Sequence, residues 1–364
     1  MTRRCIALSV LVVLCLFLAG LAVSNGKIWT SKGPRGAKGG WLVVDPTNPD
    51  ILYAATFGPS PQSDPVIFKS IDAGLNWKEI TNGLPLRRPM AIGIGAINCL
   101  AIVPKSPNVL YAGGSLAGVF KSTNAGEHWE EVNNGVPIID EYARPDTISS
   151  LVIDPQNFQI IYAGTHSIGV IKTTDGGKNW RKLGQGVFSP VKHLVIEPKT
   201  PTTLYATGGS QIFKSADAGK SWTSILSKSA VHNYGDISAL TIDENGTLYV
   251  GTAWRGIYKS SDSGESWSIL KRGLPKHTDI LHLVINPKTP AILYVVGLPL
   301  KGGLVVYRSD DDGRSWSAIN NGLPNEVFIW DLVIASSSPN VLYLGTDFGI
   351  FKTINGGKIW RALQ

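Results

Sequence analysis

The chain has 364 residues, with 34 Lys and Arg against 27 Asp and Glu, and a formal net charge of +7 at pH 7. This mild excess is spread along the chain, and no basic run exceeds two residues, as in Arg87-Arg88. The composition therefore argues against a nucleic-acid-binding groove. It supports only a weak preference for acidic partners or anionic surfaces.

The N-terminus begins with Met1-Thr2-Arg3-Arg4, followed by an apolar run from Cys5 to Val23. This pattern predicts a secretory signal peptide over residues 1–24, cleaved after Ser24, and a secreted, periplasmic or otherwise extracytoplasmic protein. The apolar run could also span a bilayer if left uncut. A membrane-anchored form is thus the alternative, and membrane contact is expected only in that case.

Cleavage would leave Cys99 as the single cysteine, so the mature chain is expected to have no intrachain disulfide. A chain of this length can bury enough apolar surface to fold without one. Because no histidine lies near Cys99 in the sequence, we expect a buried small residue at this position rather than a nucleophile.

Two short runs recur in the same order along the rest of the chain. The first is Leu42-Val43-Val44-Asp45-Pro46, and the second is Leu52-Tyr53-Ala54-Ala55-Thr56. Both are rich in β-branched or aromatic residues and are bounded by Pro, Asn or Gly, which is typical of strands joined by tight turns. The first run recurs at 100–104, 151–155, 194–198, 240–243, 283–287 and 332–334. The second recurs at 110–114, 161–165, 204–208, 248–252, 293–297 and 342–346.

A third strand is expected next, as at 349–352, and it is followed in every repeat by the signature Ser/Thr-x-Asp/Asn-x-Gly-x-x-Trp. The signature tryptophans are Trp77, Trp129, Trp180, Trp222, Trp267, Trp316 and Trp360. They lie 42 to 52 residues apart, which is the period of a four-stranded propeller blade. A fourth strand is expected to begin at each tryptophan, so that one repeat forms a four-stranded meander.

A single meander cannot bury both of its faces, and seven of them protect their edges best by closing into a ring. The sequence therefore predicts an all-β fold, a single seven-bladed β-propeller in residues 25–364 with four antiparallel strands per blade. The predicted blades are approximately 40–85, 98–137, 149–187, 192–227, 238–275, 281–324 and 330–364. The stretch 25–29 echoes 355–360 and could help to close the ring.

Each signature residue is predicted to have a structural task on the turn between the third and fourth strands. The glycine supplies a positive φ, the Asp or Asn oxygen accepts hydrogen bonds from turn amides, and the tryptophan anchors the turn in the sheet. The acceptors are Asp72, Asn124, Asp175, Asp217, Asp262, Asp311 and Asn355. Because asparagine occurs twice, the position requires an acceptor rather than a negative charge.

The signature resembles the Asp-box, or bacterial neuraminidase repeat, and the fuller pattern at 151–155, 161–165 and 173–180 most resembles sortilin-type and xyloglucanase-type propellers. The resemblance implies the fold strongly and the function weakly, since Asp-box propellers include hydrolases, sorting receptors and assembly factors. Sialidases of this superfamily carry an Arg-Ile-Pro motif before the first box, and residues 27–70 contain only Arg35 and no such motif. Xyloglucanases use two propellers with one catalytic Asp each, so a site of that kind would need two chains.

Residues that depart from the repeat are the candidate functional residues. In propellers, the loops that enter the inner strands crowd around one mouth of the central channel. Asp236 and Asp279 lie four residues before the leading Leu of their inner strands, Asp146 lies five before, and Asp331 directly precedes Leu332. We expect these four carboxylates to share one rim. Asp236 and Asp279 come from adjacent blades and could serve as the acid and base of a glycosidase, while loop capping is the alternative.

His193 and His282 occupy matching positions just before the leading Leu of their strands. Packing in the channel wall is the more economical interpretation, because no third ligand can be identified. The sequence therefore predicts no metal site and no cofactor.

The longest insertions, at 58–65, 86–98, 138–147 and 297–303, supply further binding candidates. Aromatic and arginine side chains are favoured at protein and sugar contacts. Those in or beside non-repeating loops are Arg87, Arg88, Tyr142, Arg144, Trp254, Arg255 and Trp330.

These observations predict an exported, non-catalytic propeller that presents one rim to a protein or glycan partner. All the strongly repeated polar residues form turns, and no complete catalytic constellation remains once they are set aside. The alternative is a glycoside hydrolase that acts on a β-glucan-type polysaccharide through Asp236 and Asp279.

Overall fold

The structure is a computed structural model that describes residues 38–57, 66–84, 96–184, 190–225 and 236–363. The predicted signal peptide, the 25–29 echo, Arg87 and Arg88 lie outside the described residues. The described residues form seven four-stranded sheets and no helix. Among them there is therefore no apolar helix that could cross a membrane. All the described residues belong to one compact unit.

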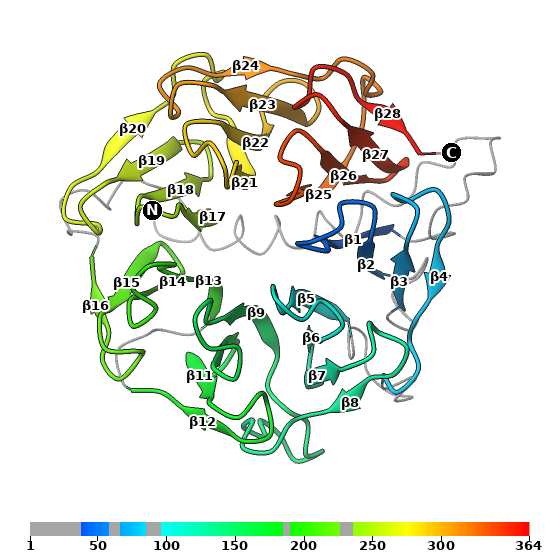
Figure 1. Ribbon diagram of the computed structural model, residues 1–364. Helices are drawn as coiled ribbons and strands as arrows, with labels where there is room; N and C mark the ends of the chain where they lie inside the picture. Colours follow the sequence, from blue (N-terminus) through cyan, green and yellow to red (C-terminus); the bar gives the residue numbers. More distant parts are fainter. Residues whose placement is uncertain (1–37, 58–65, 85–95, 185–189, 226–235, 364) are drawn as a thin grey trace, which may run out of the picture. The chain divides into compact units, whose positions relative to one another are not determined.

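Each sheet is a blade made of four consecutive antiparallel strands, numbered in chain order from blade 1 (β1–β4) to blade 7 (β25–β28) (Figure 1). The inner strands are β1 (Lys38–Val44), β5 (Ile97–Ile102), β9 (Ile148–Ile153), β13 (Val191–Ile196), β17 (Ile237–Ile242), β21 (Asp279–Ile285) and β25 (Ile329–Ile334). The second strands are β2 (Leu52–Phe57), β6 (Leu110–Gly114), β10 (Ile161–Thr165), β14 (Leu204–Gly208), β18 (Leu248–Thr252), β22 (Leu293–Leu298) and β26 (Leu342–Thr346).

The third strands are β3 (Val66–Ser70), β7 (Gly118–Ser122), β11 (Val170–Thr173), β15 (Gln211–Ser215), β19 (Gly256–Ser260), β23 (Val305–Ser309) and β27 (Gly349–Thr353). The short outer strands are β4 (Lys78–Glu79), β8 (Glu130–Glu131), β12 (Trp180–Lys182), β16 (Thr223–Ser224), β20 (Ser268–Leu270), β24 (Ser317–Ala318) and β28 (Arg361–Ala362). Six outer strands begin one residue after the signature tryptophan, and only β12 begins at it.

Each inner strand contacts the inner strands of the two neighbouring blades, and β1 contacts β25, so the blades close into a ring. The prediction of a seven-bladed β-propeller with four antiparallel strands per blade is confirmed. Because consecutive strands are antiparallel, the loops before the inner strands and those between second and third strands share one face, which we call the rim. The Asp-box turns lie on the opposite face.

Apolar clusters between neighbouring blades form the core. One cluster joins Ile67 of blade 1 with Phe120 and the fully buried Trp129 of blade 2. Another joins Leu42 of blade 1 with Tyr343 of blade 7 and so bridges the first and last blades. Burial of such side chains contributes about 25 cal/mol per Å² of apolar surface. Because the clusters lie between neighbouring blades, this contribution is distributed around the ring instead of being concentrated in one place.

The Asp-box turns are held by the same hydrogen bonds in all seven blades. In blade 3, Asp175 Oδ1 accepts the Thr173 hydroxyl at 2.7 Å and the Asn179 N–H at 2.9 Å, while the Gly177 N–H donates to Thr173 Oγ1 at 3.0 Å. The Asn179 side-chain amide also donates to Asp175 Oδ2, at 2.8 Å. This bond first, and then the bonds from Thr173 and the Asn179 N–H, lower the pKa of Asp175 to about 2. Asn355 accepts the Thr353 hydroxyl at 2.8 Å in the same way.

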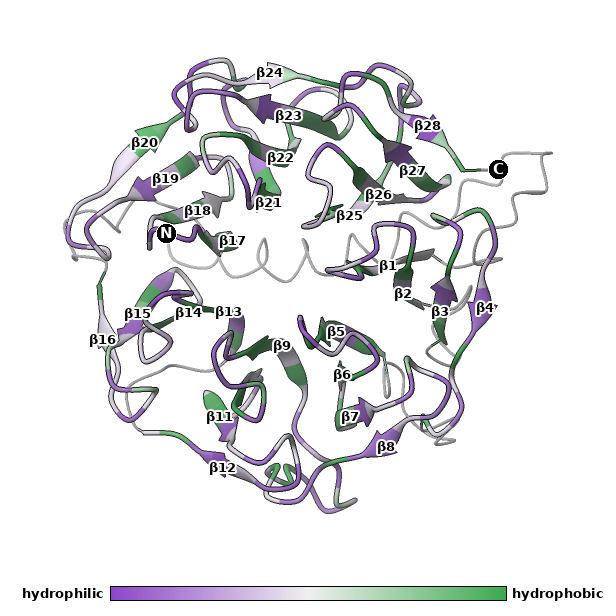
Figure 2. Ribbon diagram, in the orientation of Figure 1, coloured by the Kyte–Doolittle hydropathy of each residue, from purple (hydrophilic) through white to green (hydrophobic). Residues whose placement is uncertain are grey.

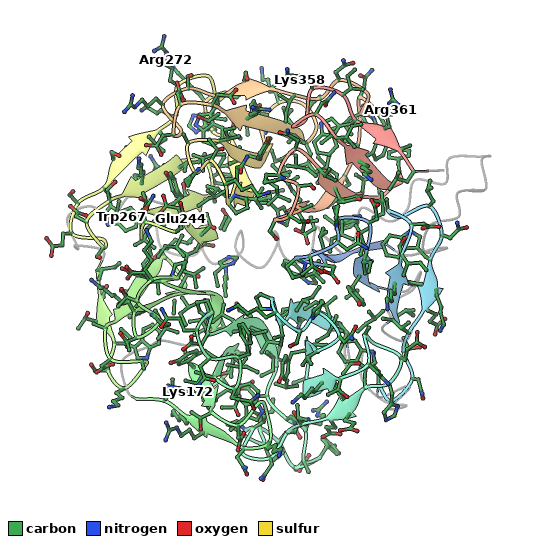
Figure 3. The ribbon with its side chains drawn as sticks, in the orientation of Figure 1. Lys172, Glu244, Trp267, Arg272, Lys358 and Arg361 are labelled. Atoms are coloured by element: carbon green, nitrogen blue, oxygen red, sulfur yellow. The ribbon has the colours of Figure 1, made fainter. Side chains whose placement is uncertain are left out.

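A second contact, between a tyrosine and a basic residue, repeats in all seven blades, and the sequence pattern did not predict it. Every second strand carries a buried tyrosine that faces a Lys or Arg of the third strand, with the cation 4.7 to 6.0 Å from the ring centroid. Figure 2 shows the basic residues as hydrophilic positions on the third strands, and Figure 3 labels Lys172, the partner of Tyr162. In blade 2, Tyr111 and Lys121 both donate to the Gly176 carbonyl of the next Asp-box, at 3.0 and 2.8 Å. The pair therefore joins the second and third strands of every sheet, and in blade 2 it also reaches the following blade.

Candidate functional site

The inner strands aim selected side chains into the central channel. In six of them a β-bulge leaves one residue unpaired two positions before the leading Leu, for example Ser149 and Ser238. The hydroxyls of these two serines donate to the carbonyls of Val191 and Ile280 in the next inner strand. Bulges re-aim neighbouring side chains, and here they also join adjacent blades near the rim.

The residue just before the leading Leu lies at the same level in all seven inner strands. The seven residues at this level are Trp41, Cys99, Ser150, His193, Ala239, His282 and Asp331. Trp41 of blade 1 and His282 of blade 6 meet edge to face, with ring centroids 6.5 Å apart. Blades 1 and 6 are not neighbours, so this contact crosses the channel.

His282 and Asp331 form the most polar pair at this level. His282 Nδ1 lies 3.4 Å from Asp331 Oδ1. Asp331 is buried, and it accepts the Leu42 N–H at Oδ2 and the Leu332 N–H at Oδ1, both at 2.8 Å. Burial raises the pKa of Asp331, while His282 and the two amides act in the opposite direction. The carboxylate therefore joins blade 7 to blade 1.

His193 lies at the same level on β13. Burial, together with Lys192 and His282, lowers the pKa of His193 to about 4. Its imidazole is therefore neutral near pH 7. Among the described residues, no group of three or more His, Cys, Asp and Glu side chains could hold a metal ion.

Asp236 and Asp279 lie at the rim, above this level, on adjacent blades. Asp236 is exposed, whereas Asp279 is half-buried and its Oδ1 is fully covered without a hydrogen-bond partner among the described residues. Burial first, and then the charge of Asp236, raise the pKa of Asp279 to about 6. The two carboxylates are therefore close enough to interact electrostatically.

Asp146 and Asp331 are placed differently from this pair. Asp146 is fully buried; its carboxylate accepts the Thr147 N–H at 2.8 Å and the Ser167 N–H and hydroxyl at 3.1 Å. It links the loop before β9 to the loop after β10. Asp146 lies in the rim loop before β9, and Asp331 lies on β25. Hydrogen-bond donors of neighbouring residues enclose both carboxylates.

The predicted aromatic and arginine candidates occupy separate loops. Tyr142 is 69% exposed, and the Arg144 guanidinium lies 5.3 Å from its ring centroid while it pairs with Asp140. Trp254 and Arg255 are exposed between β18 and β19. That loop is tied to Asp236 by a 2.9 Å hydrogen bond from the Ala253 N–H to the Asp236 carbonyl.

Trp330 is half-buried on β25 and packs against Phe328, with ring centroids 4.3 Å apart. Its Nε1 has no hydrogen-bond partner among the described residues. Sequence reasoning missed Phe328, which is 37% exposed, and the neighbouring exposed Phe348. The available signal was position, since Phe328 occupies the place four residues before the leading Leu that Asp236 and Asp279 occupy in blades 5 and 6.

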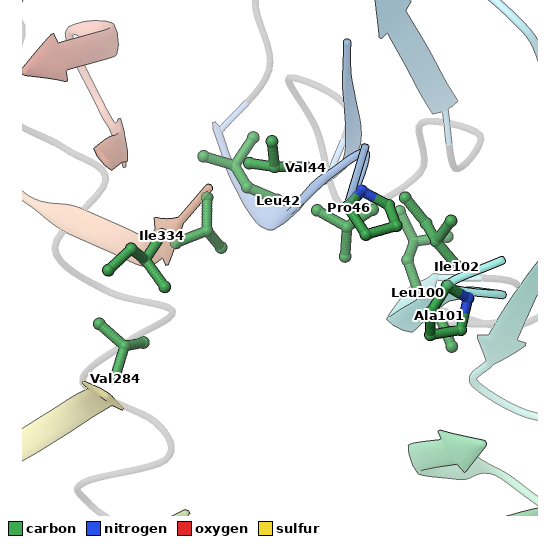
Figure 4. Close-up of a pocket in the computed structure, with 11 residues that line it drawn as sticks. Leu42, Val44, Pro46, Leu100, Ala101, Ile102, Val284 and Ile334 are labelled. Atoms are coloured by element: carbon green, nitrogen blue, oxygen red, sulfur yellow. The ribbon is translucent and has the colours of Figure 1, made fainter. Parts of the chain in front are cut away.

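A cavity of about 340 Å³ lies at the other end of the inner strands (Figure 4). Its lining is apolar and comes from β1, β5, β21 and β25 with the turns that follow β1 and β5, including Leu42, Val44, Leu100, Val284 and Ile334. It presents no side chain that could act as an acid, base or nucleophile.

The fold and these side chains define a β-propeller of the Asp-box type. No protein-family model matches the chain. It is related to a probable oligoxyloglucan-reducing end-specific xyloglucanase of Neosartorya fischeri, 28% identical over 213 residues that make up 56% of this chain and 25% of that protein. It is also 27% identical over 202 residues to a xyloglucanase of Hypocrea jecorina, covering 49% of this chain and 23% of the relative. The matched region thus spans about a quarter of these relatives.

Solved structures share the fold at lower identity. The GH74 xyloglucanase from Xanthomonas campestris superposes with a TM-score of 0.72 at 15% identity, over 93% of this chain and 55% of that one. YCF48 from Cyanidioschyzon merolae gives 0.63 at 13% identity, over 88% and 96% of the two chains. YCF48 bound to D1 peptide gives 0.56 at 15% identity, over 73% and 80%. At these identities the similarity concerns the fold alone.

Proposed function

We propose that the protein is an exported, non-catalytic β-propeller that binds a protein or glycan partner through its rim. The proposal rests on the location of the large apolar side chains that are exposed. Those on rim loops or at strand ends beside them are Ile138, Ile139, Tyr142, Trp254, Leu298, Leu300, Phe328 and Phe348. In the described part of the chain, the Asp-box face exposes fewer large apolar side chains, and none of them is aromatic: Ile71, Leu75, Ile354 and Ile359. Exposed apolar patches with aromatic side chains mark interaction sites.

The exposed ring of Trp254 supports this proposal. Trp254 is 55% exposed and lies on the turn between β18 and β19. Its φ of +66° belongs to the turn itself, because Leu116 has a φ of +52° at the same position between β6 and β7. An exposed aromatic side chain on such a loop favours contact with a protein or a sugar.

The relatives support two ligand classes. A structural relative is YCF48 bound to D1 peptide, and the curated relatives are xyloglucanases. A peptide and a polysaccharide are therefore the first ligands to examine.

The test is a binding screen of the purified protein against a glycan array and a phage-displayed dodecapeptide library. We expect Tyr142→Ala/Trp254→Ala to weaken binding of the selected ligands at least tenfold. Ile71→Ser/Ile354→Ser, which changes two exposed apolar residues on the Asp-box face, should leave binding unchanged. Ligands that bind the rim variant normally and are lost in the Asp-box-face variant would refute the proposal.

A glycoside hydrolase is the second candidate, favoured by the raised pKa of Asp279 beside Asp236. A carboxyl that titrates near pH 6 can act as a general acid while its charged neighbour assists. The test is reducing-sugar release from xyloglucan, with Asp236→Asn/Asp279→Asn as the control. Release that disappears in the variant would support hydrolysis, whereas no release from the wild-type protein would exclude xyloglucan as a substrate.

A further inference from the structure

One part of the rim combines carboxylates with exposed apolar side chains. We call Asp236, Asp279, Leu298, Phe328 and Phe348 the acidic–aromatic patch. Asp236 directly precedes β17 and Asp279 begins β21, and these adjacent inner strands contact each other. The charge of Asp236 acts on Asp279. Asp279 is also the register partner of Leu298 across β21 and β22. Asp279 therefore lies directly beside an exposed leucine.

The patch continues from blade 6 to blade 7. After Leu298 the loop passes close to the segment that leads into β25, since a Cβ added at Gly303 would lie 3.3 Å from the Asn325 carbonyl oxygen. The Phe328 N–H donates to Asp347 Oδ1 at 2.8 Å, and the Asp347 N–H donates to the Phe328 carbonyl at 3.0 Å. These two bonds fix the loop that carries Phe348 beside Phe328.

Within the part of the chain that the structure describes, the charge of the two carboxylates is not compensated. Among the described residues, no Lys, Arg or His forms an ion pair with Asp236 or Asp279. Among these residues, the covered Oδ1 of Asp279 also has no hydrogen-bond donor. A half-buried carboxylate without a cation is unfavourable, so a ligand that brings a cation to the accessible side of the two carboxylates would bind with a net gain.

We propose that the acidic–aromatic patch binds a peptide segment of a partner protein, with an Arg or Lys side chain between Asp236 and Asp279 and a neighbouring apolar side chain on Phe328 and Phe348. This inference rests on the proposed binding function and names its ligand. A guanidinium or ammonium group supplies the missing cation and donates to the accessible carboxylate oxygens. The exposed Trp254, next to the residue that is hydrogen-bonded to Asp236, offers a ring face that also favours a cation.

Charge distinguishes this ligand from a sugar. The neutral hydroxyl groups of a sugar would satisfy the hydrogen-bonding capacity of the accessible carboxylate oxygens. They would leave the two negative charges uncompensated. The phenylalanines and Leu298 form a surface that suits an aliphatic or aromatic peptide side chain. Charge complementarity and the apolar surface therefore favour a peptide.

The experiment selects a phage-displayed random dodecapeptide library on the purified protein and measures the affinity of the enriched peptides by fluorescence anisotropy. We expect enrichment of an Arg or Lys next to an apolar residue. Asp236→Asn/Asp279→Asn should weaken binding about tenfold or more, and Phe328→Ala/Phe348→Ala should also weaken it. Replacement of the peptide arginine by citrulline should weaken binding to the wild-type protein and have no further effect on the Asp variant.

The matched control is Glu244→Gln/Glu265→Gln, which removes the same two charges from exposed positions of blade 5 on the opposite face; Figure 3 labels Glu244. It should bind like the wild-type protein. Equal loss in this control would show a general charge effect and overturn the inference. Peptides that bind through Tyr142 and Trp254 but tolerate the Asp variant would overturn it while leaving the proposed function intact. Selection of glycans alone would overturn the peptide assignment, and binding through the Asp-box face would overturn both.

Discussion

Aspartates in this protein titrate in opposite directions because their surroundings differ. In the Asp-box turns, hydrogen bonds from neighbouring side chains and amides stabilise the charged form, and the pKa values of Asp175 and Asp262 fall to about 2. At the rim, burial and the neighbouring Asp236 destabilise the charge of Asp279, and its pKa rises to about 6. The number of hydrogen-bond donors around the carboxylate thus distinguishes the structural aspartates from the candidate binding aspartate Asp279.

The raised pKa of Asp279 predicts a pH-dependent cost to stability. The folded-state value is raised from 3.8 to about 6, so folding takes up a proton between these values. The cost is absent below about pH 4, grows as the pH rises, and is complete above about pH 6. We expect Asp279→Asn to raise the melting temperature by roughly 2 °C at pH 8, allowing for solvent screening, and to have no effect at pH 4.

Thermal unfolding followed by circular dichroism at both pH values measures this difference. Asp236→Asn is the companion variant, because it removes the neighbouring charge and should produce a smaller gain of the same sign. A melting temperature of Asp279→Asn that is lowered at pH 8 would mean that the ionised carboxylate is stabilised by its surroundings.

Neighbouring blades are joined where the carbonyl groups of a turn in one blade accept hydrogen bonds from the Asp-box tryptophan of the next blade. The Trp180 N–H donates to the Asn134 carbonyl at 2.8 Å, and its indole Nε1 donates to the Val132 carbonyl at 2.9 Å. Gly135 follows Asn134 with a φ of +82°, and a Cβ there would lie 2.0 Å from the Trp180 carbonyl oxygen. The Asn-Gly turn therefore allows two backbones to approach closely, which a side chain would prevent.

We expect Gly135→Ala to destabilise the protein by about 2–4 kcal/mol, because the methyl group meets backbone and the conformation is left-handed. Gly209→Ala is the matched control, since Gly209 also has a positive φ of +61° but faces open space. The control should cost only about 1 kcal/mol. Urea unfolding measures both values, and an equal cost would show that conformation, not the contact between blades, determines the effect.

At the scale of the whole ring, the described strands include none that is shared between the first and last blades. Every described sheet contains four consecutive strands, so blades 7 and 1 are held by contacts between side chains and backbone. The Asp331 carboxylate accepts the Leu42 N–H, the Tyr343 hydroxyl donates to the Pro49 carbonyl at 2.9 Å, and apolar residues pack between the two blades. This junction joins residues nearly 300 positions apart.

We expect Asp331→Asn to weaken the junction, since an amide oxygen cannot replace both carboxylate oxygens and a buried N–H loses its acceptor, at a cost of about 1–3 kcal/mol. Native-state hydrogen exchange should show faster exchange of the Leu42 amide and of strands in blades 1 and 7. Asp146→Asn is the control, because that buried carboxylate joins loops within blade 3. Exchange that accelerates uniformly around the ring in both variants would argue against a local role at the junction.

The candidate site could be predicted in part from the repeat. The proximity of Asp236 and Asp279 followed from their equal distance to the leading Leu, because equivalent positions in adjacent blades are neighbours. The burial of Asp146 was not predictable, since its enclosing partner Ser167 belongs to a different loop. Phe328 was overlooked although it occupies the same position as Asp236 and Asp279, because an aromatic residue near a strand does not by itself indicate exposure.

The sequence by itself determined the seven blades, their strand order and the chemistry of the Asp-box turns. These features depend on alternation, turn residues and hydrogen bonds within about eight consecutive residues, so the information is local. Only the tertiary structure decided which residues meet in the channel and which carboxylates remain without a partner. Trp41, His282 and Asp331 come from three blades, and their contacts and burial arise only when ring closure brings distant segments together.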